Sequence, residues 1–384
     1  MPGRRSVAPL HDFTVKIERF SLHHLRMPLV APFETSFGRE IERDCVLVVL
    51  QADGLTGYGE CVASHAPGYN YETTGTAWHI LGEFVAPSIL GVDLKSIESF
   101  RQAVSAIRGH HLAKAGVEMA LWDLFGKSAG TSLREMLGAQ RARVEVGVSV
   151  GLQASPQALV DVVHQYVQQG YTRVKLKIKP GRDLGDATAV RKAFPGLRLQ
   201  VDANSSFTLE TARTLKPLDD LELLLIEQPL FDDDIWDHRR LQREFRTPIC
   251  LDESVVSARH ARYALEMKAC RIINIKAARL GGISEAVQVH DYCHTRGIPV
   301  WCGGMLETGV GRASNLALSA LPGFRLPGDI SASDRYFARD ITSERFILNA
   351  DSTIDVPTGP GLGITIDERA LKQFTLARFD IGGA

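Results

Sequence analysis

Five charged residues recur at nearly constant intervals in the second half of the chain, and this spacing constrains the fold more than any other feature. They are Lys177, Asp202, Glu227, Asp252 and Lys276, at intervals of 25, 25, 25 and 24 residues. Each follows a short apolar run and precedes a stretch with helical periodicity, which is the pattern of consecutive β/α units. The carboxyl ends of the strands of a (β/α) barrel meet at one mouth. A single charge at a strand end is usually solvated, but five in register predict one shared pocket.

The region around these residues contains candidate strands that alternate with amphipathic stretches. The eight candidates are residues 144–150, 173–178, 197–203, 222–227, 248–253, 271–276, 299–304 and 324–329. Repeated β/α units indicate a parallel sheet, and eight of them favour a closed barrel. An open doubly wound sheet is the alternative, but no GxGxxG follows the first strand. We therefore expect an α/β protein with a TIM-like barrel.

The rest of the chain has a different pattern. Residues 14–62 read as an antiparallel meander with a loop at 30–40, and residues 72–129 read as helical, with the last helix ending at Gly126. We expect an N-terminal α+β domain over residues 1–135, the barrel over 136–340, and a C-terminal segment, 341–384, that packs back on the N-terminal domain. The loop carries Phe33 and Phe37, and a lid over the barrel mouth or ordinary loop anchoring would both explain these aromatic residues.

Composition excludes several classes of function. The formal net charge is −1 and no run of basic residues is present, which argues against a nucleic-acid or anionic-membrane partner. No apolar stretch is long enough to cross a membrane, and the first residues, MPGRRSVAPLHDF, have no apolar segment typical of a secretory signal. The six cysteines are scattered, which indicates buried thiols in a reducing compartment. We expect a cytoplasmic protein, a homo-oligomer, that acts on a small molecule.

Three of the five charged residues predict a metal site. Asp202, Glu227 and Asp252 would end three adjacent strands, and no cysteine or histidine ligand pattern accompanies them. Carboxylates are hard oxygen ligands that suit Mg²⁺ or Mn²⁺ and leave coordination positions for water and substrate. We therefore expect Mg²⁺ (or Mn²⁺) as the cofactor.

The two lysines predict acid–base chemistry. Lys177 and Lys276 would lie on strands four apart, on opposite sides of the mouth, with the α-carbon of a carboxylate substrate between them. A lysine base needs a lowered pKa, and a nearby cation lowers it. Lys175, on the same strand face as Lys177, and Arg279, three residues after Lys276, are candidates for that cation. A Schiff-base aldolase that uses Lys276 is the alternative from another enzyme class.

Several motifs together resemble the enolase superfamily, in its muconate-lactonizing subgroup, over nearly the whole chain. They are the KxK at Lys175–Lys177, DAN at Asp202–Asn204, IEQP around Glu227, DES at Asp252–Ser254, IK at Lys276, and also GYGEC and EMALWDLFGK. The resemblance implies a modified (β/α)7β barrel under an N-terminal α+β capping domain. It also implies a Mg²⁺-dependent enzyme that abstracts the α-proton of a carboxylate substrate.

Within the subgroup, KLKIKPG, WCGGMLETGVGRA and LPGDISASDRYF resemble o-succinylbenzoate synthases of menaquinone biosynthesis and N-succinylamino-acid (N-acylamino-acid) racemases. This resemblance implies Lys177 as the base and Lys276 as the opposite acid or base. It also implies substrate-binding or supporting roles for Lys175, Asn204, Ser149, Glu253, Arg279, Met305, Glu307 and Phe33. A cycloisomerase or a dipeptide epimerase is the alternative within the subgroup, although no DxD follows the last strand.

Overall fold

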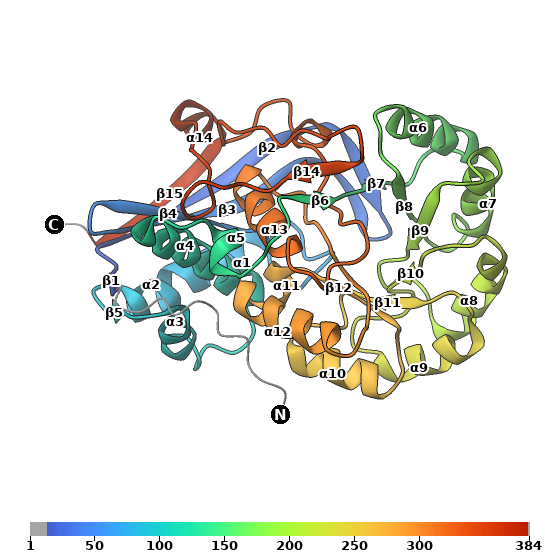
Figure 1. The fold of residues 1–384 in the computed structure, drawn as a ribbon, viewed down its shortest axis with the longest axis horizontal. Helices are drawn as coiled ribbons and strands as arrows, with labels where there is room; N and C mark the ends of the chain where they lie inside the picture. Colours follow the sequence, from blue (N-terminus) through green and yellow to red (C-terminus); the bar gives the residue numbers. More distant parts are fainter. Residues whose placement is uncertain (1–13, 383–384) are drawn as a thin grey trace.

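Two larger sheets organise residues 14–382, the part of the chain that this computed structural model describes. One sheet is antiparallel, in the order β15-β2-β3-β4, and lies in the N-terminal part. The other is parallel, with seven strands in the order β13-β12-β11-β10-β9-β8-β7. In Figure 1 the parallel sheet curls around an interior and helices α6 to α10 form its outer ring. The TIM-like α/β fold that the sequence predicts is confirmed.

The antiparallel sheet is built on one long hairpin. Its strands are β2 (Arg19–Thr35), β3 (Gly38–Ala52), β4 (Leu55–Cys61) and β15 (Thr375–Gly382), and a separate short pair joins β1 (Val15–Lys16) to β5 (Asp93–Leu94). The expected loop at 30–40 is wrong, because β2 continues to Thr35 and β3 begins at Gly38, which leaves only a tight turn. The register shift between Pro28 and Phe33 bends β2 and lets the hairpin tip extend toward the barrel.

Helices cover this sheet. They are α1 (Thr74–Ile80), a π-helical turn η1 (Leu81–Val85), α2 (Ala86–Ile89), α3 (Ile97–Ala103), α4 (His111–Ala129) and α5 (Leu133–Met136). The predicted end of α4 at Gly126 is wrong, because the helix continues to Ala129 and ends at Gly130, whose φ is 63°. Gly126 instead allows close packing, since a Cβ there would lie 2.6 Å from Gly361 Cα. Gly59 similarly lets β4 approach α4.

The parallel sheet follows the predicted alternation with shorter strands. Its strands are β7 (Val148–Val150), β8 (Arg173–Lys177), β9 (Arg198–Asp202), β10 (Ile226–Glu227), β11 (Ile249–Leu251), β12 (Ile272–Ile275) and β13 (Val300–Cys302). The helical segments between and after them are α6 (Pro156–Gln168), α7 (Leu184–Ala193), α8 (Leu209–Ala212), η2 (Arg213–Asp220), α9 (Ile235–Glu244), α10 (Ala258–Glu266), α11 (Ala277–Leu280), α12 (Ile283–His294), α13 (Gly309–Ser319) and η3 (Ser333–Arg335). The buried strands carry apolar side chains toward the helices, as parallel sheets do.

The eighth predicted strand, residues 324–329, is not a regular strand. Pro327 has no N–H to donate to a ladder. The segment still closes the barrel with single hydrogen bonds, because Asp329 N donates to Cys302 O at 2.8 Å and Gly147 N donates to Gly328 O at 2.8 Å. The first predicted strand is also divided, since β6 (Arg143–Glu145) pairs with β14 (Thr353–Asp355) and only β7 joins the barrel.

The C-terminal segment returns to the N-terminal sheet, where α14 (Glu368–Phe374) leads into β15, which pairs with β2. The domain boundaries at 135 and 340 stay predictions. All six cysteines are buried and free of disulfides. No helix among residues 14–382 is long and apolar enough to span a bilayer. The N-terminal stretch from which we expected no secretory signal lies outside the described residues.

Candidate active site

The five spaced residues all lie at the carboxyl ends of consecutive strands. Lys177, Asp202 and Glu227 are the last residues of β8, β9 and β10, and they are neighbours in the sheet register. Asp252 follows β11 directly, and Lys276 follows β12 and precedes α11. All five side chains are at most 8% exposed. The structure therefore brings the predicted residues together at one buried mouth.

The turns that follow two of these strands have unusual backbone conformations. Asn204 and Ser205 have φ of 43° and 61°, and Gln228 has φ of 35°. Residues other than glycine rarely adopt this left-handed region, and such conformations gather at functional sites. Asn204 N donates to Asp202 Oδ1 at 3.0 Å, which fixes this turn beside the carboxylate.

Lys175 and Lys177 hold the carboxylates on one side of the mouth. Lys177 Nζ donates to Asp202 Oδ2 and to Asn204 Oδ1, both at 2.6 Å. Lys175 Nζ lies 2.8 Å from Glu227 Oε2, 3.0 Å from Asp202 Oδ2 and 2.6 Å from Asp329 Oδ2. Lys175 is thus an anchor for carboxylates in this arrangement.

Lys276 and Arg279 hold Asp252 on the other side. Lys276 Nζ donates to Asp252 Oδ2 at 2.7 Å, and the Arg279 guanidinium donates to Oδ1 of the same carboxylate. Arg279 also donates to the backbone carbonyls of Val255 and Asn274. Arg279 therefore positions Asp252 and the start of α11, rather than acting mainly on Lys276.

The electrostatic environment reverses one expectation from the sequence. Burial opposes the charge on Lys276, but the Asp252 carboxylate outweighs it and raises the pKa of Lys276. Burial likewise opposes the charge on Lys175, but Asp202, Asp329 and Glu227 raise the pKa of Lys175 well above its ordinary value. The predicted lowering of the Lys276 pKa by Arg279 is therefore wrong for this arrangement, because Arg279 is neutralised by Asp252.

The carboxylates themselves repel one another. Burial and the charges of Asp202 and Asp252 raise the pKa of Glu227 well above its ordinary value. Burial, Asp252 and Asp202 also raise the pKa of Glu253 to about 8, and Glu253 Oε2 is buried without a hydrogen-bond partner. Burial would raise the pKa of Asp202, but Lys175 and Lys177 hold it below its ordinary value.

This donor set fits a hard divalent cation. Asp202, Glu227 and Asp252 supply anionic oxygens from three adjacent strand ends, and their mutual repulsion would be relieved by a positive ion between them. In the present arrangement their oxygens are turned toward the lysines and Arg279. Accordingly, no three His, Cys, Asp or Glu side chains among residues 14–382 are placed to hold one ion together. To bind a metal ion, these carboxylates would have to turn from the lysines and Arg279 toward the ion.

The remaining predicted residues fall into two groups. Ser149 is the register partner of Lys175 and its Oγ is buried without a partner, while the Phe33 ring centroid lies 6.0 Å from Lys177 Nζ. Asn204 and Glu253 are joined by a hydrogen bond of 2.9 Å. In the described part of the chain, no hydrogen bond or ion pair joins Met305 or Glu307 to either lysine, and Glu307 instead accepts a hydrogen bond from Asn315 of α13.

Three neighbours of the site escaped the sequence analysis. Tyr69, from the N-terminal part, donates to Asp252 Oδ1 at 2.9 Å. Asn274 donates to Glu227 Oε1 at 2.6 Å, and Asp329 contacts both Lys175 and Arg173. The alternation of a strand could have revealed Asn274, two residues before Lys276. Asp329 ends the eighth predicted strand, so the expectation that charged residues at strand ends collect at the barrel mouth applies to it as well. Nothing in the sequence marks Tyr69 as a site residue.

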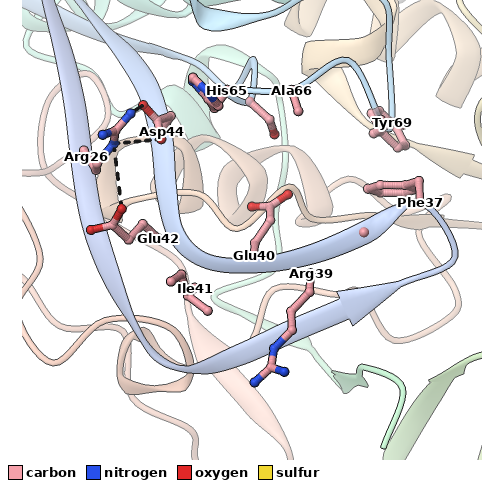
Figure 2. A pocket seen from close by; sticks show the side chains of 13 residues that line it. Arg26, Phe37, Arg39, Glu40, Ile41, Glu42, Asp44, His65, Ala66 and Tyr69 are labelled. Carbon is pink, nitrogen blue, oxygen red and sulfur yellow. Dashed lines mark hydrogen bonds and ion pairs between the residues drawn. The ribbon is translucent and has the colours of Figure 1, made fainter.

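A cavity of about 370 Å³ adjoins this site on the side of the N-terminal hairpin. Figure 2 shows it between the hairpin residues Arg26 to Asp44 and the segment that carries His65 and Tyr69. The rings of Phe37 and Tyr69 lie at one end of the view, and Arg26 pairs with Asp44 at the other. Tyr69, which lines this cavity, also donates to Asp252, one of the candidate metal ligands.

Comparison with known protein families agrees with this geometry. A family model described as "Enolase C-terminal domain-like" matches residues 158–370, and one described as "Mandelate racemase / muconate lactonizing enzyme, N-terminal domain" matches residues 16–138. The chain is a member of the enolase superfamily. Membership of this superfamily implies a divalent metal ion.

Similar proteins show to which family within the enolase superfamily this chain belongs. It is 47% identical to an o-succinylbenzoate synthase from Geobacillus kaustophilus, over 94% of this chain and 96% of the relative. It is 46% identical to an N-succinylamino acid racemase from Thermus thermophilus, over 94% and 98%. An enolase-superfamily crystal structure from Listeria innocua superposes with a TM-score of 0.91 at 44% identity, covering 96% of this chain and 99% of the other. The chain belongs to the family of these synthases and racemases.

Proposed function

We propose that this enzyme removes the α-proton of a carboxylate substrate, and that it racemises N-succinylamino acids, forms o-succinylbenzoate by dehydration, or does both. One observation supports the proposal: Lys177 ends β8 and Lys276 directly follows β12, four strands apart in a curled sheet, and three carboxylates lie at the ends of the strands between them. The names of the relatives supply the two substrate classes. Family membership argues against the Schiff-base aldolase.

For racemisation, the two lysines act from opposite faces of the α-carbon. Lys177 takes the proton from one enantiomer while Lys276 delivers a proton to the other face, and the roles reverse for the other enantiomer. Lys175 and Asn204 orient the substrate carboxylate beside Lys177. Burial of both lysines keeps bulk water away from the exchanging protons.

For the dehydration, one base is enough. Lys177 removes the α-proton and returns a proton to the departing hydroxyl, which leaves as water. Lys276 stays charged and faces the negative charge that develops on the substrate. Mg²⁺ or Mn²⁺, held by Asp202, Glu227 and Asp252, would supply Lewis-acid stabilisation of that charge.

The test is an assay of purified protein with Mg²⁺ on both substrate classes. Polarimetry follows an N-succinylamino acid, and ultraviolet absorbance follows o-succinylbenzoate formation. We expect at least one reaction, and we expect excess chelator to stop it. A dipeptide or muconate substrate that turns over while both of these fail would favour the epimerase or cycloisomerase alternative.

A further inference from the structure

Arg335, at the end of η3, is a buried cation without an acidic partner. Its side chain is 9% exposed, and no carboxylate in the described part of the chain forms an ion pair with it. Its Nη2 donates to the backbone carbonyl of Ser149 at 3.1 Å, while its Nε is buried with no partner. A buried charge normally has an ionic partner, because desolvation is costly.

Three aromatic rings surround the guanidinium in place of a carboxylate. The Arg335 Cζ lies 5.0 Å from the Tyr166 ring centroid, 4.9 Å from Tyr336 and 5.8 Å from Phe33. Cation–π contacts of this kind offset part of the desolvation cost, but they do not engage the N–H donors of the guanidinium that remain beside the bond to Ser149. The site is therefore shaped for an anion that comes from outside the protein.

Arg335 also lines a cavity of about 600 Å³ between the β2–β3 hairpin and α6. The lining contains Arg39, Arg182 and Arg335 but only one carboxylate, Glu34. Glu34 lies 3.5 Å from Lys179, and Arg182 is paired with Asp186. Arg335 is thus the buried cation of this cavity that remains available to a ligand.

One aromatic side chain links this guanidinium to the candidate base. The Phe33 ring has Lys177 Nζ 6.0 Å from its centroid and Arg335 Cζ 5.8 Å from it. The two cations are therefore no farther apart than the sum of these distances. Ser149 provides a second link, because its carbonyl accepts from Arg335 and its register partner is Lys175.

We propose that Arg335 binds the distal carboxylate of the substrate's acyl arm and thereby sets a preference for N-succinyl over neutral N-acyl substrates. This inference rests on the function proposed above. Five bonds separate the α-carbon of an N-succinylamino acid from the distal carboxyl carbon, and they span roughly 6 Å when extended. A contact of about 3 Å at each end lets such an arm run along the Phe33 ring from Lys177 to Arg335. A carboxylate would use the free donors of the guanidinium in a charge-assisted pair.

A second buried arginine provides a contrast. Arg312 is 3% exposed and also has no acidic partner among the described residues. However, its two terminal nitrogens donate to the backbone carbonyls of Ser331 and Glu307. Arg312 thus donates hydrogen bonds to two backbone carbonyls, whereas Arg335 donates to one carbonyl and lines a cavity.

The experiment compares two substrates on one set of variants. N-succinylphenylalanine carries the distal carboxylate, and N-succinamoylphenylalanine carries a neutral carboxamide of nearly the same shape. In the Mg²⁺-loaded enzyme, we expect Arg335→Met to lower kcat/KM for the succinyl substrate about 10- to 100-fold, mainly through KM. The neutral substrate should change less than about 3-fold, so the ratio of the two kcat/KM values collapses. Arg335→Lys should retain part of the preference.

Arg182→Met is the matched control, since Arg182 lines the same cavity but is already paired, and it should leave the ratio unchanged. Thermal unfolding of each variant separates misfolding from a specific effect, and Arg335→Lys serves if the methionine variant does not fold. An active wild-type enzyme whose substrate ratio survives both Arg335 substitutions would overturn the role of Arg335 alone. A wild-type enzyme inactive on both substrate classes would overturn the proposed function, and this inference with it.

Discussion

Tyr69 and Asp252 join the two parts of the chain at the candidate active site. The Tyr69 hydroxyl donates to Asp252 Oδ1 at 2.9 Å, although the residues are 183 positions apart in the sequence. The same hydroxyl accepts from Lys276 at 3.2 Å, and the Lys276 amine lies 4.2 Å from the ring centroid. The N-terminal part therefore supplies one wall of the site and orients both a candidate metal ligand and a candidate base.

We expect Tyr69→Phe to lower kcat/KM about 10-fold and the free energy of unfolding by about 1 kcal/mol, because it removes one buried hydroxyl and keeps the ring. Steady-state kinetics and urea denaturation measure the two effects. Tyr71→Phe is the control, since Tyr71 is largely exposed two residues away. A Tyr69→Phe enzyme with unchanged kinetics would show that the hydroxyl does not orient the site.

Arg279→Gln should lower kcat/KM for the racemase and synthase reactions by similar factors, about 10-fold or more. By its spacing from Lys276, Arg279 was a candidate for the cation that lowers the pKa of Lys276, an effect that would matter more for racemisation than for dehydration. The bond from Arg279 to Asp252 replaces that expectation, because loosening Asp252 affects both reactions. The measurement is kcat/KM for both substrates on one preparation, with the exposed Arg271→Gln as the control. A loss confined to racemisation would instead indicate that Arg279 acts through the protonation of Lys276.

Glu60 should make stability depend on pH. Burial, only partly offset by hydrogen bonds from Thr308, raises the pKa of Glu60 from 4.5 to about 7. The folded state then binds this proton more tightly than the unfolded chain does. The contribution of Glu60 to stability is therefore largest below pH 4.5 and is lost as the pH rises through about 7.

We expect Glu60→Gln to flatten this part of the pH profile, so that the variant loses less free energy of unfolding than the wild type between pH 5 and pH 8. Urea denaturation at several pH values provides the measurement. Glu42→Gln, at a more exposed carboxylate, should keep the wild-type slope. Equal slopes for Glu60→Gln and the wild type would mean that Glu60 titrates normally in the folded protein.

The sequence located the strand-end residues because their positions follow from a repeating local pattern. A strand of known period, ended by one charge and followed by a helix, places Asp202 or Glu227 without knowledge of distant contacts. The prediction of a regular eighth strand is wrong because Pro327 interrupts the hydrogen bonding between strands. The barrel is closed there by single hydrogen bonds, which the periodicity of the sequence does not reveal. The prediction of a loop at 30–40 is wrong because the hairpin continues past a register shift.

The contacts that shape the site lie beyond that local pattern. Tyr69 reaches Asp252 only when the N-terminal part docks on the barrel, and Arg335 reaches Phe33 only when η3 packs against the hairpin. Charge balance is equally non-local. From its spacing in the sequence, Arg279 was expected to act as a cation on Lys276. In the structure its three hydrogen bonds go to Asp252, Val255 and Asn274.

Metal removal tests the carboxylate cluster. Chelation should abolish activity, and Mg²⁺ or Mn²⁺ should restore it. Glu227→Gln should weaken metal binding, measured by calorimetry, and should leave the barrel folded, because the amide keeps the shape and relieves repulsion from Asp202 and Asp252. Glu244→Gln, which removes a carboxylate on the surface, is the control and should leave metal binding unchanged. Full activity in excess chelator would contradict the metal assignment.

Proton exchange in D₂O tests the paired lysines most directly. With each enantiomer of an N-succinylamino acid in turn, α-proton exchange is followed by NMR in the wild type, Lys177→Ala and Lys276→Ala. The wild type should exchange both enantiomers. Lys177→Ala should stop exchange from one enantiomer only, and Lys276→Ala should stop exchange from the other, because each lysine reaches one face of the α-carbon. Exchange of both enantiomers in either variant would contradict the claim that Lys177 and Lys276 are the opposed bases of this enzyme.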